Sequence, residues 1–370
     1  MNNESENQSH LTRNDYAVGW ICALFEEQTA ATAMLDQEHP DLPKPPDDPN
    51  TYTLGSIGEH NIVIACIPEG TMGNNAATAC ATQMGRTFPS IRIGLMVGIG
   101  GGIPSKVKLG DVVISIPVDQ YPGVVQWDFG KAEDGRKFRR KGALNSPPTA
   151  LLTAVAKLRS RNRLKKHSIL PGYLEDMGKR WPPLVPQYSE PPSSELAGYQ
   201  DKVHILRPLG RQILASADRG GKMARLNQAP KQPGVCDVHC GLIASGNQVI
   251  KDAEIRDIID ENLGGKVLCV EMEAAGLMND FPCIVIRGIC DYADRRKNDE
   301  WQPYAAAVAA ACARALLEYV QPSHVASERP LRDILIREKK IWNSFQLITA
   351  IGRASFSKCN KQDLFSDSYK

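Results

Sequence analysis

The chain alternates short apolar runs with polar segments that carry glycine and proline. The first run, AVGWICAL at residues 17–24, is continuous and bounded by polar residues, as in a buried strand, and residues 26–35 follow it with a helical pattern. Repeated strand, loop and helix favour a layered α/β fold with a largely parallel sheet. The same pattern predicts further strands at residues 52–57, 61–67, 92–97, 239–243, 267–270 and 283–289, and helices that open near residue 74 and span 151–166 and 302–319.

Three regions fall outside this alternation. Residues 1–15 are polar, and we expect a disordered lead there, before a domain at residues 16–320. Within the domain the strand signal fades at about residues 160–234, where we expect a basic insert whose proline-rich part, 182–192, is irregular. Residues 321–370 are polar and basic without a clear core pattern, so we expect a tail or linker.

Length and composition exclude several classes of protein. A chain of 370 residues with 42% hydrophobic residues holds one large α/β domain with additions, or two ordinary domains. The formal net charge of +2 gives no support to a nucleic-acid scaffold. No apolar run approaches the ~20 residues of a membrane span, and the polar start lacks the apolar stretch of a secretory signal. We therefore expect an intracellular, cytoplasmic protein that binds neither nucleic acid nor membranes.

The ten cysteines suggest thiols in a core more than a disulfide framework. Several lie inside apolar strand or helix patterns, where a reduced thiol behaves as a small hydrophobic side chain. The segment Cys236-Asp237-Val238-His239-Cys240 has cysteine and histidine at a spacing that suits zinc, but no second pair stands nearby to complete four ligands. We predict no metal site and no cofactor.

Acidic residues follow two of the predicted strands. In VEMEAA (270–275) two glutamates flank a methionine where a strand gives way to a helical pattern, and in IRGICDYAD (286–294) an apolar run ends in an aspartate. Ligands of parallel α/β sheets bind at the carboxyl ends of the strands. Acids at two such ends therefore predict one shared crevice.

These segments resemble the purine nucleoside phosphorylase and nucleosidase superfamily (the PNP/UDP phosphorylase family), and more closely its fungal nucleoside phosphorylase-like domain. The resemblance spans about residues 16–320, with a gap at roughly 160–234. It implies a three-layer phosphorylase/hydrolase-like α/β fold, in which helices flank a central mixed, largely parallel twisted sheet. Four more pieces match in the same order: VGWICALFEE (18–27), MVGIGGGIP (96–104), LGDVV (109–113) and GLIASGNQVIK (241–251).

Cleavage of a purine N-glycosidic bond needs a proton for the departing base and a nucleophile for a sugar carbon that gains oxocarbenium character. The resemblance implies that Asp291 is the general acid at the purine N7. It also implies that Glu27 orients and deprotonates the attacking water, assisted by Arg287. Without the resemblance, Asp291 also fits an N-cap or turn aspartate, and Glu27 a solvated helix residue.

Sugar and base contacts follow from the same resemblance. Glu273 resembles the glutamate that holds the ribose hydroxyls, and Met272 the residue that packs on the sugar beside Glu271. The two glutamates also fit first-turn acids that favour a helix dipole, and both interpretations can hold together. Val249 and Ile250 stand where relatives contact adenine through packing and backbone groups. No polar side chain is evident there to recognise a guanine O6, so adenine is the predicted base.

A glycine loop is predicted at Gly98, Ile99, Gly100 and Gly101. Glycine permits backbone amides to approach an anion or a sugar, although the segment lacks the GxGxxG spacing of a dinucleotide fold. Ile99 stands where relatives often carry a hydroxyl that binds the nucleophile. Residues 96–97 are Met and Val where one branch of phosphorylases has a phosphate-binding arginine. Water is therefore predicted as the nucleophile in preference to phosphate.

The predicted function is that of a purine nucleosidase, which hydrolyses the N-glycosidic bond of an adenine nucleoside or nucleotide to free base and sugar or sugar phosphate. A phosphorylase is one alternative, and a non-catalytic nucleoside-binding sensor or signalling module is another. The resemblance also implies a homo-oligomer. Five cations of the insert are candidates for gripping a polyphosphate such as ATP, or for simply solvating a surface loop: Arg207, Arg211, Arg219, Lys222 and Arg225.

Overall fold

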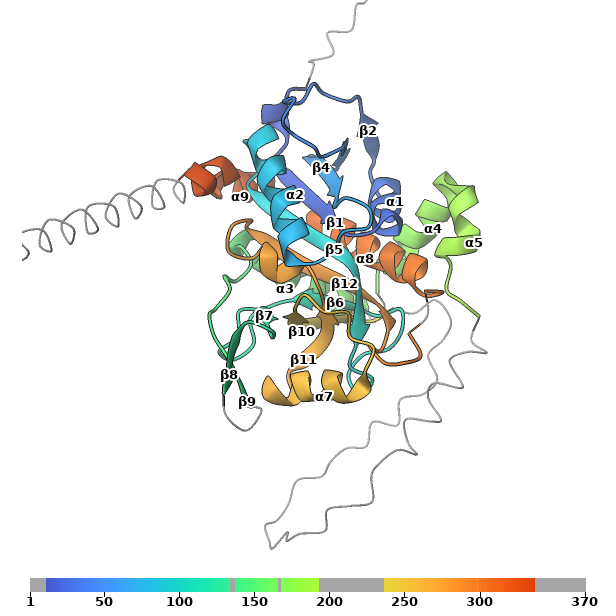
Figure 1. Cartoon of the computed structure of the whole chain (residues 1–370). Coiled ribbons are helices and arrows are strands. Elements are labelled where there is room, and N and C mark those ends of the chain that lie inside the picture. The colour runs from blue at the N-terminus through green and yellow to red at the C-terminus, as the bar shows by residue number, and fades with distance from the viewer. Residues whose placement is uncertain (1–10, 134–136, 166–167, 193–235, 298, 337–370) are drawn as a thin grey trace, which may run out of the picture.

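The computed structural model describes residues 11–133, 137–165, 168–192, 236–297 and 299–336. A mixed sheet forms the centre of the molecule, and helices lie on both of its faces (Figure 1). The predicted fold class, a mixed and largely parallel sheet flanked by helices, is confirmed. None of the helices within these ranges combines the length and apolar character needed to cross a membrane.

The sheet contains both parallel and antiparallel pairs. The strand order is β11-β10-β6-β12-β5-β1-β4-β3-β2, with β7 beside β10. β1 pairs parallel with β4 and β5, β12 pairs parallel with β5, and β10 pairs parallel with β6, β7 and β11. At one edge of the sheet, β3 pairs antiparallel with β2 and β4. The strands are β1 (Val18–Cys22), β2 (Gln37–His39), β3 (Tyr52–Ile57), β4 (His60–Cys66), β5 (Ile93–Gly102), β6 (Val112–Ser115), β7 (Val124–Gln126), β10 (Val238–Ser245), β11 (Val267–Glu271) and β12 (Cys283–Asp291), with a separate hairpin of β8 (Gly130–Glu133) and β9 (Lys137–Arg140).

The long strand β5 closes part of the sheet on itself. Its last residues, Gly101 and Gly102, pair antiparallel with Val270 and Cys269 of β11, while β11 also pairs with β10. The strands β5, β12, β6, β10 and β11 thus form a closed circuit of pairings. This closure brings the carboxyl ends of β5, β11 and β12 to one place.

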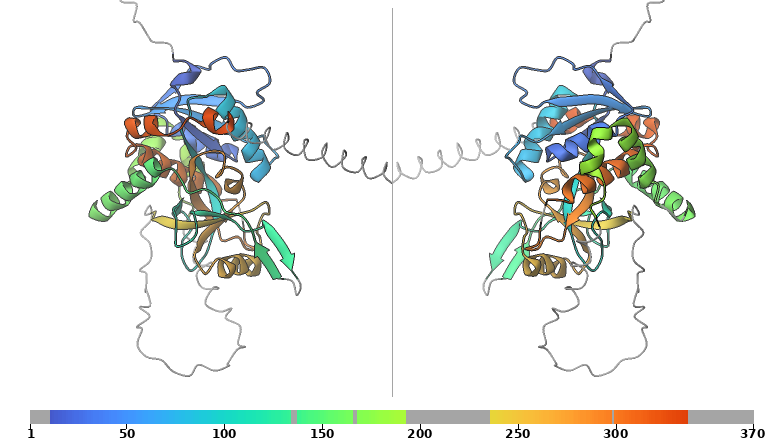
Figure 2. Two further views of the ribbon diagram at one scale, coloured as in Figure 1. Left: turned by 90° about the vertical axis from the view of Figure 1, so that its left-hand side faces the viewer. Right: turned by 90° about the vertical axis from the view of Figure 1, so that its right-hand side faces the viewer.

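Helix α8 is the main element behind the sheet as drawn in Figure 1, with α2 in front of it. It contacts β12 and β5, and α1, α3, α4 and α5 pack around it (Figure 2). The approach is close, because a Cβ on Gly288 of β12 would lie 2.0 Å from the carbonyl oxygen of Ala305. The helices are α1 (Phe25–Ala33), α2 (Asn74–Thr87), α3 (Thr149–Lys165), α4 (Leu170–Arg180), α5 (Val185–Tyr188), α7 (Ala253–Asn262), α8 (Gln302–Leu317) and α9 (Pro322–Ser327), with 3-10 turns η1 (Arg13–Asp15), η2 (Pro182–Leu184) and η3 (Ala274–Gly276).

Two local predictions were wrong. The glycine segment 98–102 is the second half of β5 and not a loop. Its backbone stays extended because it pairs with β12 on one side and, at its end, with β11. The helical pattern after Val270 yields only the short turn η3.

The predicted insert and flanking segments are more structured than their composition indicated. Residues 170–188 form α4, η2 and α5, and α4 and α5 pack on α8. Of the proline-rich part predicted to be irregular, residues 182–188 are therefore helical and residues 189–192 are irregular. Packing also continues past residue 320, because Val325 and Leu331 are buried. Residues 12–15 of the expected lead form a capped turn. The rest of the lead, the insert from 193 to 235 with its five candidate cations, and residues 337–370 lie outside the described ranges.

Candidate active site

A cavity of about 590 Å³ opens at the carboxyl ends of the strands. Its walls come from the last residues of β5, β11 and β12 and from the segments that follow β1, β4, β10, β11 and β12. The two acidic segments predicted to share one crevice do so. Of the residues proposed from the sequence, these line it: Glu27, Ile99, Gly100, Gly101, Val249, Ile250, Glu271, Met272, Glu273, Arg287 and Asp291.

The carboxylate of Glu27 is fixed by backbone amides. Glu27 is in the first turn of α1 and is 4% exposed, so the interpretation as a solvated helix residue is wrong. Its Oε2 accepts hydrogen bonds from the amides of Ala23 (2.6 Å) and Leu24 (3.2 Å), and its Oε1 accepts one from the amide of Ile99 (2.9 Å). Burial raises the pKa of Glu27, and the neighbouring Arg287 partly opposes this change. Glu27 is thus a preorganised carboxylate with the raised basicity that a general base needs.

Arg287 is a buried cation held between carboxylates. It projects from β12 and is 1% exposed. Its Nη2 forms an ion pair with Glu271 Oε2 and lies 3.4 Å from Glu273 Oε2. Burial opposes its charge, but these carboxylates raise its pKa overall, so Arg287 is a permanent cation.

Glycine at position 98 makes room for this arrangement. A Cβ there would lie 2.2 Å from Glu27 Oε1 and 2.6 Å from Arg287 Nη1. Gly98 itself does not line the cavity but lies directly behind the two charged groups. Gly98 therefore leaves room for two side chains of the site, while the backbone amide of the next residue, Ile99, donates to the Glu27 carboxylate.

Glu271 and Glu273 differ in their surroundings. Glu271 accepts hydrogen bonds from the amides of Glu273 (3.2 Å) and Ala274 (3.1 Å) beside its ion pair with Arg287. The prediction that the two glutamates are first-turn acids of a helix is wrong, because only the three-residue turn η3 follows them. Glu273 accepts a hydrogen bond from the amide of Gly73 (3.3 Å). Burial, together with the carboxylates of Glu271 and Glu27, raises the pKa of Glu273 to about 7 against the opposing effect of Arg287. Near neutral pH the Glu273 carboxyl group is therefore partly protonated, so it can both donate and accept hydrogen bonds, which suits contact with hydroxyl groups.

Asp291 is the last residue of β12 and lies in a tight turn. Its Oδ1 accepts a hydrogen bond from the amide of Ala293 (2.7 Å), and Ala293 has a φ of 51°, in the left-handed region. The turn interpretation of Asp291 is therefore correct, and the residue also faces the cavity. Its Oδ2 lies 3.2 Å from Nζ of Lys297, a cavity residue that sequence reasoning missed.

The segment after β10 forms another wall. Ile250 is 8% exposed and Val249 is 45% exposed. Asn247 fixes the segment, because its amide donates to Asp128 Oδ2 (2.7 Å) and its Oδ1 accepts from the amide of Asn74 at the start of α2 (3.0 Å). Two exposed apolar side chains at the mouth, Phe25 and Met72, were also not predicted.

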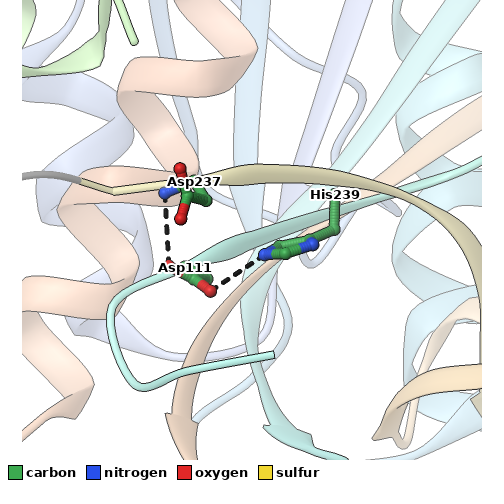
Figure 3. Close-up of side chains that lie close together, drawn as sticks. All are labelled: Asp111, Asp237 and His239. Atoms are coloured by element: carbon green, nitrogen blue, oxygen red, sulfur yellow. Dashed lines mark hydrogen bonds and ion pairs between the residues drawn. The ribbon is translucent and has the colours of Figure 1, made fainter. Parts of the chain in front are cut away.

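The histidine of the possible zinc motif has a different set of neighbours. Asp111, before β6, lies between Asp237 and His239 (Figure 3). Asp111 Oδ2 is 2.9 Å from Nε2 of His239 and accepts from the amide of Lys108 (2.9 Å), and Oδ1 accepts from the amide of Asp237 (3.2 Å). These bonds join the starts of β6 and β10, and none of these residues lines the cavity. The arrangement is that of a structural link between strands.

Comparison with known structures places the fold among nucleosidases. A futalosine hydrolase of Helicobacter pylori superposes with a TM-score of 0.51 at 17% identity, covering 83% of this chain and 99% of that one. A 5′-methylthioadenosine/S-adenosylhomocysteine nucleosidase of S. pneumoniae gives 0.51 at 18% identity, covering 82% and 100%. No family model matches the chain.

Two similar sequences are informative in different ways. A nucleotide-binding leucine-rich repeat (NLR)-like protein of the fungus Hyaloscypha variabilis is 47% identical over 324 residues. The match takes in 86% of this chain but 31% of that protein, so the chain spans about a third of the length of this relative. A 5′-methylthioadenosine/S-adenosylhomocysteine nucleosidase of Mycobacterium bovis is 24% identical over 311 residues, 81% of this chain and 95% of that protein.

Proposed function

We propose that the protein is a purine nucleosidase that hydrolyses the N-glycosidic bond of an adenine nucleoside or nucleotide. One observation carries the proposal: Asp291 and Glu27, from segments far apart in sequence, open into the same cavity with Arg287 and Glu273. A proton donor and a carboxylate base in one cavity are the two groups that this hydrolysis requires. The names of the similar proteins, two nucleosidases and a hydrolase, support the same reaction class.

Each group then has a chemical task. Glu27, fixed by three amides, accepts a proton from the attacking water. Glu273 holds the ribose hydroxyls while Arg287 keeps the neighbouring carboxylates in place. Asp291 passes a proton to N7 as the base departs. Fixed groups of this kind accelerate a reaction because they need no rearrangement as charge develops.

The charge of the lining favours water over phosphate as the nucleophile. Within the described residues, six acids and two cations line the cavity. Arg287 and Lys297 are both paired with carboxylates, so neither stands free for an incoming dianion. The acidic surroundings suit a cationic, oxocarbenium-like transition state and oppose a phosphate ion. The acids are Glu26, Glu27, Glu69, Glu271, Glu273 and Asp291.

The same charges bear on the substrate. A polyphosphate chain would need cations beyond those of the described lining, and the five candidate cations of the insert lie outside the described residues. An adenine nucleoside with an uncharged 5′ end fits the described lining best. Val249 and Ile250 offer packing and backbone groups for the base, in keeping with adenine.

The test is release of free base. The purified chain is incubated with adenosine, methylthioadenosine, inosine, AMP and ATP, with and without inorganic phosphate, and the products are separated by chromatography. The proposal expects adenine from an adenine substrate without phosphate. Base release only with phosphate would identify a phosphorylase, and tight binding without any product would identify a sensor; either result would overturn the proposal.

A further inference from the structure

Lys297 is a cation of the cavity to which the reaction above gives no task. It lies between β12 and α8, and its Nζ is 3.2 Å from Asp291 Oδ2. The Asp291 side chain is 3% exposed, whereas that of Lys297 is 24% exposed and in contact with solvent. The pair thus connects a buried carboxylate to water through a lysine.

This geometry bears on the source of the proton for the leaving base. The group that protonates the base must receive a new proton in each turnover, and a protonated lysine in contact with it can supply one. Burial opposes the charge of Lys297, but the neighbouring carboxylates of Asp291 and Asp299 raise its pKa overall. Lys297 is therefore a protonated group next to the carboxylate that meets the base.

We propose that Lys297 supplies, through Asp291, the proton that the departing purine takes up; this inference rests on the proposed nucleosidase function. As the C1′–N9 bond breaks, its electron pair moves into the purine and N7 becomes basic. The Asp291 carboxyl gives a proton to N7 and receives one from Nζ of Lys297. Water bonds to C1′ and loses a proton to Glu27, which then releases it to solvent, and the neutral lysine is reprotonated by solvent. In this scheme Asp291 is the catalytic residue and Lys297 is a positioning residue that acts through it.

Other titratable groups face the pair. Cys290 Sγ lies 3.2 Å from Asp291 Oδ2, and burial followed by the Asp291 charge raises its thiol pKa well above the usual value. Cys290 therefore stays a neutral thiol. Asp299, before α8, adds to the charge around the lysine, and Asp294 is engaged with Arg296 at 3.4 Å in the same loop. These neighbours support a protonated Lys297.

The test compares Lys297→Met and Lys297→Arg with the unaltered chain, measuring kcat and KM for base release across the pH range. Methionine removes the proton source, so kcat near neutral pH is expected to fall about 10- to 100-fold while KM stays within about threefold. Its pH optimum should move to the acid side, because solvent must then supply, in place of Lys297, the proton that Asp291 passes to the base. Arginine keeps the charge but does not release its proton, so it too should lose kcat at neutral pH.

Controls separate this inference from a structural effect and from the proposed function. Lys266→Met removes a lysine from a surface pair with Asp119 and should leave the pH profile unchanged. Thermal unfolding of each variant checks the fold. If the unaltered chain releases base and either Lys297 variant retains its kcat and pH profile, the inference fails and the nucleosidase stands. If the unaltered chain releases no base from any substrate, the proposed function fails first.

Discussion

The carboxylate of Glu27, on α1, occupies the space that a side chain at position 98, on β5, would fill. A Cβ on Gly98 would lie 2.2 Å from Glu27 Oε1, whereas that oxygen now accepts the amide hydrogen of Ile99 at 2.9 Å. The smallest residue in the strand therefore sets the position of the proposed base.

Gly98→Ala should displace Glu27 and Arg287 together. We expect the free energy of unfolding to fall by about 1–3 kcal/mol and base release to fall by roughly 100-fold, because the added methyl group overlaps both charged groups. Chemical denaturation and a steady-state assay measure the two effects. The matched control is Gly172→Ala in α4, where a Cβ meets nothing within 4 Å and the helix should gain about 0.5–1 kcal/mol. A Gly98→Ala protein with unchanged kcat would show that the position of Glu27 does not matter.

Glu273 should make stability depend on pH. Its pKa in the folded protein is raised to about 7 from 4.5, so the native state keeps a proton that the unfolded chain loses. The free energy of unfolding therefore decreases as pH rises from about 4.5 to about 7, and Glu27, whose pKa is also raised, acts in the same direction. We expect a loss of about 1–3 kcal/mol across this window from Glu273 and a shallower slope in Glu273→Gln. Equal slopes in urea unfolding at several pH values would contradict this assignment.

Much of the fold followed from the sequence because the buried strands are continuous apolar runs. The central strand β12 is buried along its whole length, since it pairs with β5 and β6 and α8 packs against it. The helices α4 and α5 were missed because each begins with proline in its first turn. Proline is accepted there, since the first amides of a helix have no intrahelical partner.

The part of the candidate site formed by acidic residues at the carboxyl ends of strands could be predicted from the sequence. Lys297 could not, because its contact with Asp291 depends on the turn at Ala293 and on the start of α8, which no local pattern specifies. The glycine-rich segment 98–102 predicted a loop, yet strand pairing keeps it extended. The antiparallel pairing of β5 with β11 could not be predicted from the sequence either, because it joins residues far apart in the chain.

The segment after α8 should contribute to stability. Leu331 is 1% exposed, and its Cδ2 lies 2.5 Å from where a Cβ on Gly85 of α2 would be. Leu331→Ala is therefore expected to lower the free energy of unfolding by about 2–4 kcal/mol. Ile336→Ala, at a position 52% exposed, should change it by no more than about 0.5 kcal/mol. Similar values for the two variants would mean that residues after 320 do not pack on the domain.

The most direct measurement is adenine release from adenosine and methylthioadenosine, without phosphate, by the unaltered chain and by Asp291→Asn. Asparagine has nearly the same shape but no acidic proton, so we expect turnover to fall by about 100- to 10,000-fold while thermal unfolding stays close to that of the unaltered chain. Turnover that survives the substitution unchanged would contradict the account of Asp291 as the acid of this cavity.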